Sequence, residues 1–288
     1  MTLDDRIKKD LDDLYNKGEI DGAKALDGLI TAKNGQTSFA TKALPCYYWG
    51  DRSAKTVLVM LNPGEDVNKA NDNLKCELNR RSMKNAADIT MYNDWSVNYG
   101  HYDKNRHDNF DLKQAFFLRE WKNTGISLPQ GLCAQSTKQM LLSAKESVLV
   151  QKLQLELIPY ASSSFSNFVK GKISSVLPFV ETLLDEIFSQ EREYIIFCSR
   201  KFEDVFRAFN EHNKQQNRNI NVKSTYHDTQ LPGLSKKVSC CILDINYYGQ
   251  NKKAVIANTF PRQDITNAYE AMAAYGKFCY KCLLSHLP

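Results

Sequence analysis

The sequence predicts an α/β protein in which helices cover both faces of a mostly parallel central sheet, a three-layer α/β/α sandwich. Three observations support this fold class. Short apolar runs of strand length alternate along the chain with stretches of helical periodicity. The first of these runs is continuously apolar, as in a central strand covered on both faces. Several runs also stop abruptly at turn-forming residues.

Four apolar runs are predicted to be strands of the sheet. They occupy residues 57–61, 153–158, 194–198 and 254–257. Residues 238–243 are a further strand candidate at the edge of the sheet. Residues 211–225 are polar and are expected to form a loop.

The helices are predicted from apolar residues that recur every three or four positions. Residues 4–33 indicate one or two amphipathic helices, and further helices are expected at residues 110–122, 176–190, 201–210 and from Asp264 onward. We therefore expect an N-terminal helical segment at residues 1–40 and a single α/β domain at residues 41–288. A long insertion interrupts this domain at about residues 65–150, and structureless stretches of such length are uncommon unless they are functional or disordered.

The composition is that of an ordinary globular protein. With 288 residues, 42% hydrophobic and 25% charged, the chain can bury a substantial core. The net charge of +5 permits a nucleic-acid partner without requiring one. No apolar stretch approaches the ~20 residues of a membrane helix, and the start MTLDDRIKKD lacks the apolar segment of a signal peptide. The expectation is a cytoplasmic protein with no membrane partner.

The cysteines are expected to be reduced, because a chain of this length does not need disulfide staples. Cys279 and Cys282 form a C-x-x-C pair. A zinc or iron–sulfur site usually needs a second pair at a matching spacing, and the adjacent Cys240 and Cys241 do not supply one. No metal site is predicted.

Three of the predicted strands end at polar or turn-forming residues. Their ends are the triplet Asn62-Pro63-Gly64, residues 159–164 and residues 258–262. A plain turn explains the triplet without any function, because proline fixes φ, glycine tolerates positive φ and asparagine bonds its own backbone. In open parallel sheets, however, ligands bind beyond the carboxyl ends of the strands. Taken together, the three ends indicate a candidate site.

Two of these strand ends resemble motifs of the uracil-DNA glycosylase superfamily. MLNPG at residues 60–64 resembles the first catalytic motif, which is GINPG in the mismatch-specific thymine/uracil branch and GMNPG in the single-strand-selective branch. NTFPRQ at residues 258–263 is similar in place and shape to the final motif, HPSPRN or NPSGLN. The matched core extends from about residue 57 to residue 284, with close identity confined to the two motifs. The resemblance implies the uracil-DNA glycosylase-like fold, DNA as the partner, and no cofactor.

The resemblance also implies a monofunctional DNA glycosylase, which hydrolyses the N-glycosidic bond of a flipped base and leaves an abasic site. Asn62 would position the attacking water, because an amide orients water but is too weak to be a strong base. Asn258 would be the second catalytic residue, near the base carbonyl. Pro63 and Gly64 would shape the loop that grips the base, with Tyr160 as a further base-binding residue.

The final motif implies contacts with the DNA duplex. Phe260, Pro261 and Arg262 would lie on a loop that enters the minor groove, where apolar wedges and arginines stabilise a distorted duplex. Arg200, which follows the predicted strand at residues 194–198, is a further candidate DNA contact. Neither motif contains a lysine that could form a Schiff base, which favours hydrolysis alone.

Two departures from the family bear on the base. Met60 replaces the family's glycine, which would narrow or reshape the pocket. In the single-strand-selective branch an asparagine three residues before a proline reads the uracil edge, and counting back from Pro159 gives Glu156. A carboxylate accepts hydrogen bonds and the N4 amino group of cytosine donates them, so Glu156 would favour a cytosine-type base, including the bulky modified cytosines of some phage genomes. The activity would then serve phage defence or base-excision repair. The alternative is that Glu156 faces solvent or forms an ion pair.

The insertion mixes aromatic and basic side chains, among them Tyr92, Trp95, Lys104 and Arg106. Such a mixture suits base stacking and phosphate contacts, or a surface subdomain that packs its own aromatic residues. Two other functions also remain open. One is a non-catalytic nucleic-acid-binding module of the same fold, and the other is a hydrolase of small nucleosides or nucleotides.

Overall fold

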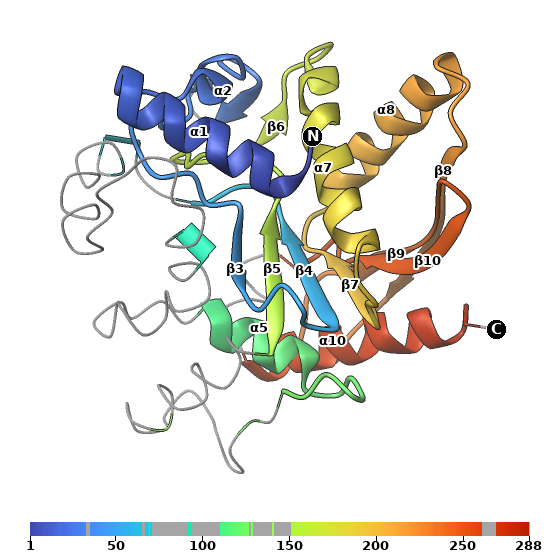
Figure 1. The fold of residues 1–288 in the computed structure, drawn as a ribbon. Coiled ribbons are helices and arrows are strands. Elements are labelled where there is room, and N and C mark those ends of the chain that lie inside the picture. Colours follow the sequence, from blue (N-terminus) through green and yellow to red (C-terminus); the bar gives the residue numbers. More distant parts are fainter. Residues whose placement is uncertain are drawn as a thin grey trace. The chain divides into compact units, whose positions relative to one another are not determined.

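The chain folds around a central sheet, in a computed structural model that describes residues 1–32, 35–64, 67–68, 70, 92–93, 110–126, 128, 140, 151–260 and 269–287. Seven strands form this sheet in the order β3-β5-β4-β7-β10-β9-β8, with helices flanking it (Figure 1). Contacts divide the chain into two units. Unit 1 comprises Met1–Tyr48, Met60–Ser96 and Leu155–Ser189, and unit 2 comprises Trp49–Val59, Val97–Gln154 and Gln190–Pro288.

The strands of the central sheet are β3 (Tyr48–Gly50), β4 (Thr56–Met60), β5 (Lys152–Glu156), β7 (Tyr194–Phe197), β8 (Ile220–Thr229), β9 (Val238–Tyr247) and β10 (Gln250–Ile256). The four predicted strands are confirmed as β4, β5, β7 and the last part of β10. Every residue of β4 is buried, as expected of a strand that is covered on both faces.

Within unit 2 the sheet is mixed. β4, β7 and β10 run parallel, with Val59 beside Phe197 and Phe197 beside Ile256. The carboxyl ends of these three strands therefore lie at one edge of the sheet. β10, β9 and β8 instead form an antiparallel meander.

The meander corrects two sequence-based predictions. Residues 238–243, expected at the sheet edge, begin β9, which lies between β10 and β8. Residues 211–225, expected to be a loop, include the end of one helix and the first half of β8. Only Ile220 and Val222 of the ten residues of β8 are buried, because β8 is the edge strand. An edge strand with mostly solvent-facing side chains lacks the apolar run from which strands were predicted.

Helices cover both faces of the unit 2 sheet. They are α5 (Phe110–Leu118), α8 (Lys201–Gln215) and α10 (Tyr269–Leu284). Because successive strand residues point to opposite faces, two adjacent cysteines of β9 locate two of these helices. Cys241 Sγ lies 3.3 Å from Glu203 Oε1 of α8, whereas the thiol of Cys240 is hydrogen-bonded to Cys279 of α10. α8 and α10 therefore lie on opposite faces, as Figure 1 shows.

α5 and α10 pack closely at Gly276. A Cβ atom at this position would lie 1.7 Å from the carbonyl oxygen of Phe117, so only glycine allows the two backbones to approach this closely. Trp121 completes the contact by donating its indole N–H to the Gly276 carbonyl at 3.0 Å. The rings of Phe117 and Tyr275 add an edge-to-face contact at 5.6 Å.

Unit 1 combines helices with a small antiparallel sheet. Its helices are α1 (Leu3–Lys17), α2 (Asp21–Lys24), the 3₁₀ helix η1 (Ile173–Val176) and α7 (Leu177–Phe188), and its small sheet has the order β2 (Gly35–Thr37), β1 (Ile30–Ala32), β6 (Asn167–Phe168). A capping box between Thr2 and Asp5 begins α1, and Gly18 ends it at a φ of 76°. Residues 1–40, expected to form a helical segment, thus also supply two short strands.

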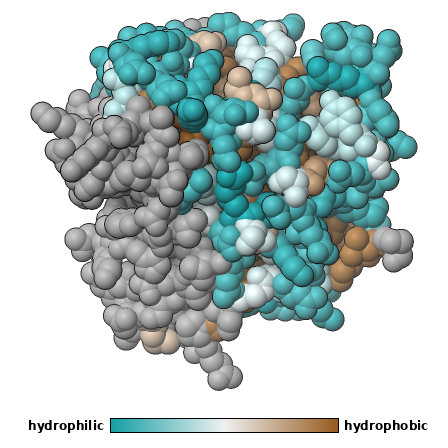
Figure 2. Space-filling view, viewed as in Figure 1, coloured by the Kyte–Doolittle hydropathy of each residue, from teal (hydrophilic) through white to brown (hydrophobic). Residues whose placement is uncertain are grey.

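The surface seen in Figure 2 is mainly hydrophilic wherever its residues are described. Large hydrophobic side chains exposed in these parts of the chain are few: Met1, Tyr226, Tyr248, Leu284 and Leu287. No helix in the described ranges is both long enough and apolar enough to cross a membrane.

Candidate active site

The predicted site begins where β4 ends, in unit 1. Asn62, Pro63 and Gly64 follow the strand and run beside the segment after β5. Gly64 forms a parallel bridge with Ser162, and the Ser162 amide donates to the Pro63 carbonyl at 3.1 Å. Two of the three predicted strand ends therefore meet in this unit.

The side chain of Asn62 is held in one orientation. Its Nδ2 donates to Ser162 Oγ at 2.8 Å, to the Pro63 carbonyl at 2.9 Å and to the Tyr160 carbonyl at 3.4 Å. Carbonyl oxygens only accept hydrogen bonds, so the nitrogen and not the oxygen of the carboxamide must face them. This contact set leaves Oδ1 as the acceptor that Asn62 presents. The half-buried side chain is thus anchored through its donor and offers its acceptor.

Gly64 faces open space. It is exposed, its φ is not positive, and a Cβ atom built on it would meet no atom of the described chain within 4 Å. Neither backbone conformation nor packing therefore requires glycine at this position. The open space is consistent with the predicted approach of a base to the Pro63–Gly64 backbone.

Tyr160 contributes to this loop through its backbone. Its ring is buried against Phe39 and Phe179, with ring centroids 6.5 Å and 6.0 Å away. Its hydroxyl donates to Asp10 Oδ2 at 2.8 Å, while Tyr47 donates to the same oxygen at 2.7 Å. The sequence predicted a base-binding side chain, whereas in this conformation the carbonyl of Tyr160 holds Asn62 and the ring lies in the core.

Asp10 is a carboxyl group in the interior of unit 1. It is only 3% exposed, and burial raises its pKa to about 6 even though the two tyrosine hydroxyls favour its charged form. Gly22 packs over this cluster, and a Cβ atom there would lie 2.3 Å from the Tyr160 hydroxyl. Polar side chains far apart in the sequence thereby fix Tyr160, and through it the Asn62 loop.

Glu156 lies in β5 and is 6% exposed. It lines a crevice of about 10 Å³ together with Arg6 and Thr182, residues of α1 and α7. A volume of this size is close to the minimum for one water molecule and is far too small for a pyrimidine. The base-reading role of Glu156 therefore remains a prediction that would require α1 or α7 to move.

Asn258 lies in unit 2, two residues after the end of β10, and is 8% exposed. Its Nδ2 donates to Glu203 Oε1 at 2.7 Å and contacts Cys241 Sγ at 3.6 Å. Its Oδ1 is buried and has no hydrogen-bond partner among the residues that the structure describes. The pKa of the Cys241 thiol is raised to about 12 by burial and by the Glu203 charge, so this thiol stays protonated. Because its Nδ2 makes the hydrogen bond to Glu203, Asn258 is anchored through its side-chain nitrogen, as Asn62 is.

The residues predicted to contact the duplex have different surroundings. Phe260 is 1% exposed and packs edge-to-face against Phe117 at 5.2 Å, so in this conformation it is a core residue and not a surface wedge. Pro261 and Arg262 lie outside the described residues. Arg200 is exposed at the start of α8, just after β7.

The long insertion is described only in part. Tyr92 is buried, and its hydroxyl donates to the Pro45 carbonyl and accepts from the Tyr47 amide, so this aromatic ring packs inside unit 1. Trp95, Lys104 and Arg106 lie outside the described residues.

Neither Cys279 nor Cys282 belongs to a metal-binding cluster in the parts of the chain that the structure describes. There, no group of three or more His, Cys, Asp or Glu side chains is placed to hold a metal ion. Cys279 is instead buried in α10 next to Cys240 of β9.

Most of the residues that support these sites carried no sequence signal. Ser162 and Asp10 support the Asn62 loop from 100 and 52 positions away in the chain, and Glu203 and Cys241 support Asn258. Of these four residues only Ser162 was indicated by the sequence, as part of the polar strand end at residues 159–164. Comparisons of the chain with protein-family models, with curated proteins and with solved structures found no match.

Proposed function

We propose that this chain is a monofunctional DNA glycosylase with a uracil-DNA glycosylase-like fold, in which Asn62 positions the water that displaces a flipped base. The observation that carries the proposal is the anchored carboxamide of Asn62. It is held by the Ser162 hydroxyl and by the backbone carbonyls of Pro63 and Tyr160. Its Oδ1 would accept a hydrogen bond from water and direct the water's lone pair at the anomeric carbon. As the bond between the water oxygen and the anomeric carbon forms, the N-glycosidic bond breaks and its electron pair leaves with the base. The water loses a proton to solvent and the departing base takes one up, so that a hydroxyl remains on the sugar. The departing base and oxocarbenium-like sugar supply most of the driving force.

Two further features support the proposal. A Cβ atom on Gly64 would meet no atom of the described residues, so within this part of the chain a base could approach the backbone beside Asn62 without displacing a side chain. Asn258, the counterpart in the final motif, has a buried Oδ1 that lacks a partner within the described structure. A buried acceptor of this kind is costly unless a ligand satisfies it. The crevice at Glu156 does not help to choose the base, so the preference for a cytosine-type base rests on the resemblance alone.

The test is base release from defined DNA. Wild-type protein is incubated with single-stranded and duplex DNA containing uracil, mismatched thymine or hypermodified cytosine, and alkali-labile abasic sites are counted. Asn62→Ala should lower base release by roughly 100-fold or more, because the water is no longer oriented, while DNA binding persists. Asn167→Ala, the same change at an exposed position of unit 1, serves as the control.

Two outcomes would overturn the proposal. One is wild-type protein that binds DNA but releases no base from any substrate, which would favour the non-catalytic binding module. The other is equal base release by wild-type protein and Asn62→Ala.

A further inference from the structure

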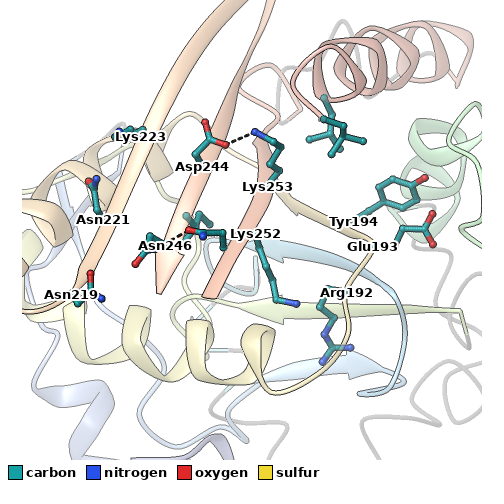
Figure 3. A pocket seen from close by; sticks show the side chains of 14 residues that line it. Arg192, Glu193, Tyr194, Asn219, Asn221, Lys223, Asp244, Asn246, Lys252 and Lys253 are labelled. Atoms are coloured by element: carbon teal, nitrogen blue, oxygen red, sulfur yellow. Dashed lines mark hydrogen bonds and ion pairs between the residues drawn. The ribbon is translucent and has the colours of Figure 1, made fainter. Parts of the chain in front are cut away.

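The central sheet ends in unit 2 at β8, which pairs with β9 on one side only. Odd-numbered residues of β8 point to the face of the sheet that Figure 3 shows, where Asn221 lies beside Asn246 of β9. Asn251 of β10 continues this row in register. Tyr226 lies opposite Cys241, whose thiol contacts α8, so even-numbered residues of β8 point to the face that α8 covers.

Asn210 of α8 shows which backbone groups of β8 point away from the sheet. Its side chain donates to the Val222 carbonyl at 2.6 Å and accepts from the Val222 amide at 2.9 Å. Just before the strand, the Asn219 carbonyl instead accepts from the amide of Tyr248, which follows β9. Because backbone groups alternate along an antiparallel strand, odd-numbered residues of β8 bond to β9 and even-numbered residues face outward. Asn210 thus fills the outer edge at Val222.

The rest of this edge is open. The outward backbone groups of Ser224, Tyr226 and Asp228 have no hydrogen-bond partner among the residues that the structure describes. The side chain of Tyr226, in the middle of the three, is 59% exposed and is the only large exposed hydrophobic residue of β8. A row of free donors and acceptors along an edge strand is a template for pairing with another strand.

An apolar side chain is also exposed on the other face of the sheet, near the same edge. Leu287 follows α10, is 45% exposed and lines one cavity together with Lys223. The ring of His286 lies 5.0 Å from the ring of His227 of β8, so the end of α10 lies against this strand. Tyr226 and Leu287 therefore border the edge from its two faces. Exposed apolar side chains beside open backbone groups favour a protein strand as the partner.

We propose that β8 pairs with β8 of a second copy of this chain, in an antiparallel and two-fold symmetric arrangement centred on Tyr226. In this register Tyr226 pairs with its own equivalent, and Ser224 pairs with Asp228 of the partner subunit. The residues with open backbone groups then bond to one another and to no others. The surface belongs to unit 2, and the proposal does not depend on the glycosylase activity.

The two ends of the open segment fit this register. The residue opposite Val222 would be Gln230, which follows the end of β8. The pairing therefore stops where Asn210 already fills the edge. Moving the centre by one residue in either direction would place an open residue opposite Val222 or Gln230. The register centred on Tyr226 is thus the symmetric one that satisfies the whole open edge.

The charges of β8 are compatible with the same register. Lys223 would lie opposite Thr229 of the partner subunit, and Asp228 opposite the partner's Ser224, so no like charges meet. The Ser224 hydroxyl can donate to the carboxylate of Asp228 on the same face. Registers centred on Lys223 or Asp228 would instead place two like charges directly opposite each other.

Sedimentation velocity on the full chain, from micromolar to millimolar concentration, tests the proposal. A pair of strands buries little area, so a reversible and concentration-dependent dimer is expected. Tyr226→Lys and Tyr226→Glu should each weaken the dimer roughly tenfold or more, because each places two like charges opposite each other. An equimolar mixture of the two variants should dimerise again, because opposite charges then meet. Tyr248→Lys, the same change at an equally exposed tyrosine outside β8, should dimerise as wild type does.

Hydrogen exchange on the wild-type protein tests the surface without any variant. The amides of Ser224, Tyr226 and Asp228 should exchange more slowly as the protein concentration rises, whereas the Val222 amide, already bonded to Asn210, should not change.

The proposal is overturned by a dimer that leaves the three amides unprotected, by equal dimerisation of Tyr226→Lys and Tyr248→Lys, or by a mixture of the Tyr226 variants that stays monomeric. A wild-type protein that is monomeric at millimolar concentration would also overturn it, and would leave the edge to a strand of another protein.

Discussion

Replacing Asp10 by asparagine should make the protein more stable at neutral pH. Asp10 accepts hydrogen bonds from Tyr47 and Tyr160 on one oxygen and is 3% exposed, so its ionised form is poorly solvated. The amide of Asp10→Asn keeps an oxygen that accepts both hydroxyls, and it carries no charge at any pH. The amide also brings two N–H donors, whose contribution does not change with pH, so the pH dependence of the variant's stability relative to wild type isolates the cost of burying the charge.

The size and sign of the effect follow from the pKa of Asp10. Burial raises that pKa from its ordinary value of 3.8 to about 6. Between about pH 4 and pH 6 the unfolded chain releases this proton while the folded chain keeps it, so the free energy of unfolding falls as the pH rises. One pKa unit corresponds to about 1.4 kcal/mol, which gives about 3 kcal/mol lost by pH 7 on account of Asp10 alone.

Urea denaturation monitored by tryptophan fluorescence gives the free energy of unfolding at pH 4, 5, 6 and 7. The difference between Asp10→Asn and wild type should shift by about 2.4 kcal/mol in favour of the variant between pH 4 and pH 7, because about 0.6 kcal/mol is already lost at pH 4 and other titrations cancel in the difference. Asp27→Asn, the same change at an exposed position of unit 1, is the control. A difference that does not change with pH would refute the reasoning.

Three further predictions concern single contacts. Gly64→Ala should fold at least as stably as wild type, since its Cβ meets no atom of the residues that the structure describes, yet should release bases more slowly; unchanged activity would show that no base approaches there. Asp111→Ala should cost about 3–5 kcal/mol in urea denaturation, because it removes the carboxylate 2.7 Å from the fully buried ammonium of Lys152, and a cost below about 1 kcal/mol would contradict this. Glu203→Ala should lower base release roughly tenfold without weakening DNA binding, since Asn258 loses its anchoring acceptor, and an unaltered rate would exclude that role.

The strands in the middle of the sheet could be predicted because burial on both faces demands continuous apolar residues. β4 illustrates this rule, since all five of its residues are buried. β8 could not be predicted in the same way. It is held by backbone pairing to β9 along its whole length, so its exposed side chains are free to be polar.

In the candidate site, too, some features could be predicted from the sequence and others could not. Asn62, Pro63 and Gly64 stood out in the sequence because three turn-forming residues stop an apolar run abruptly and resemble a known catalytic motif. The sequence did not show which neighbours orient them, because hydrogen bonds such as that from Asn62 to Ser162 connect positions 100 residues apart. Phe260 shows the converse: its motif suggests an exposed wedge, whereas in this conformation it packs against Phe117 and is buried.

By itself, then, the sequence determined the α/β class, the central strands and the position of Asn62 at a strand end. These features follow from local patterns of apolar and turn-forming residues, which can be recognised from neighbouring positions in the sequence. Only the tertiary structure decided that Asn62 is anchored through its nitrogen, that Tyr160 points into the core toward Asp10, and that Asn221, Asn246 and Asn251 lie in register across β8, β9 and β10. Each of these depends on side chains that strand pairing and helix packing bring together from distant parts of the chain.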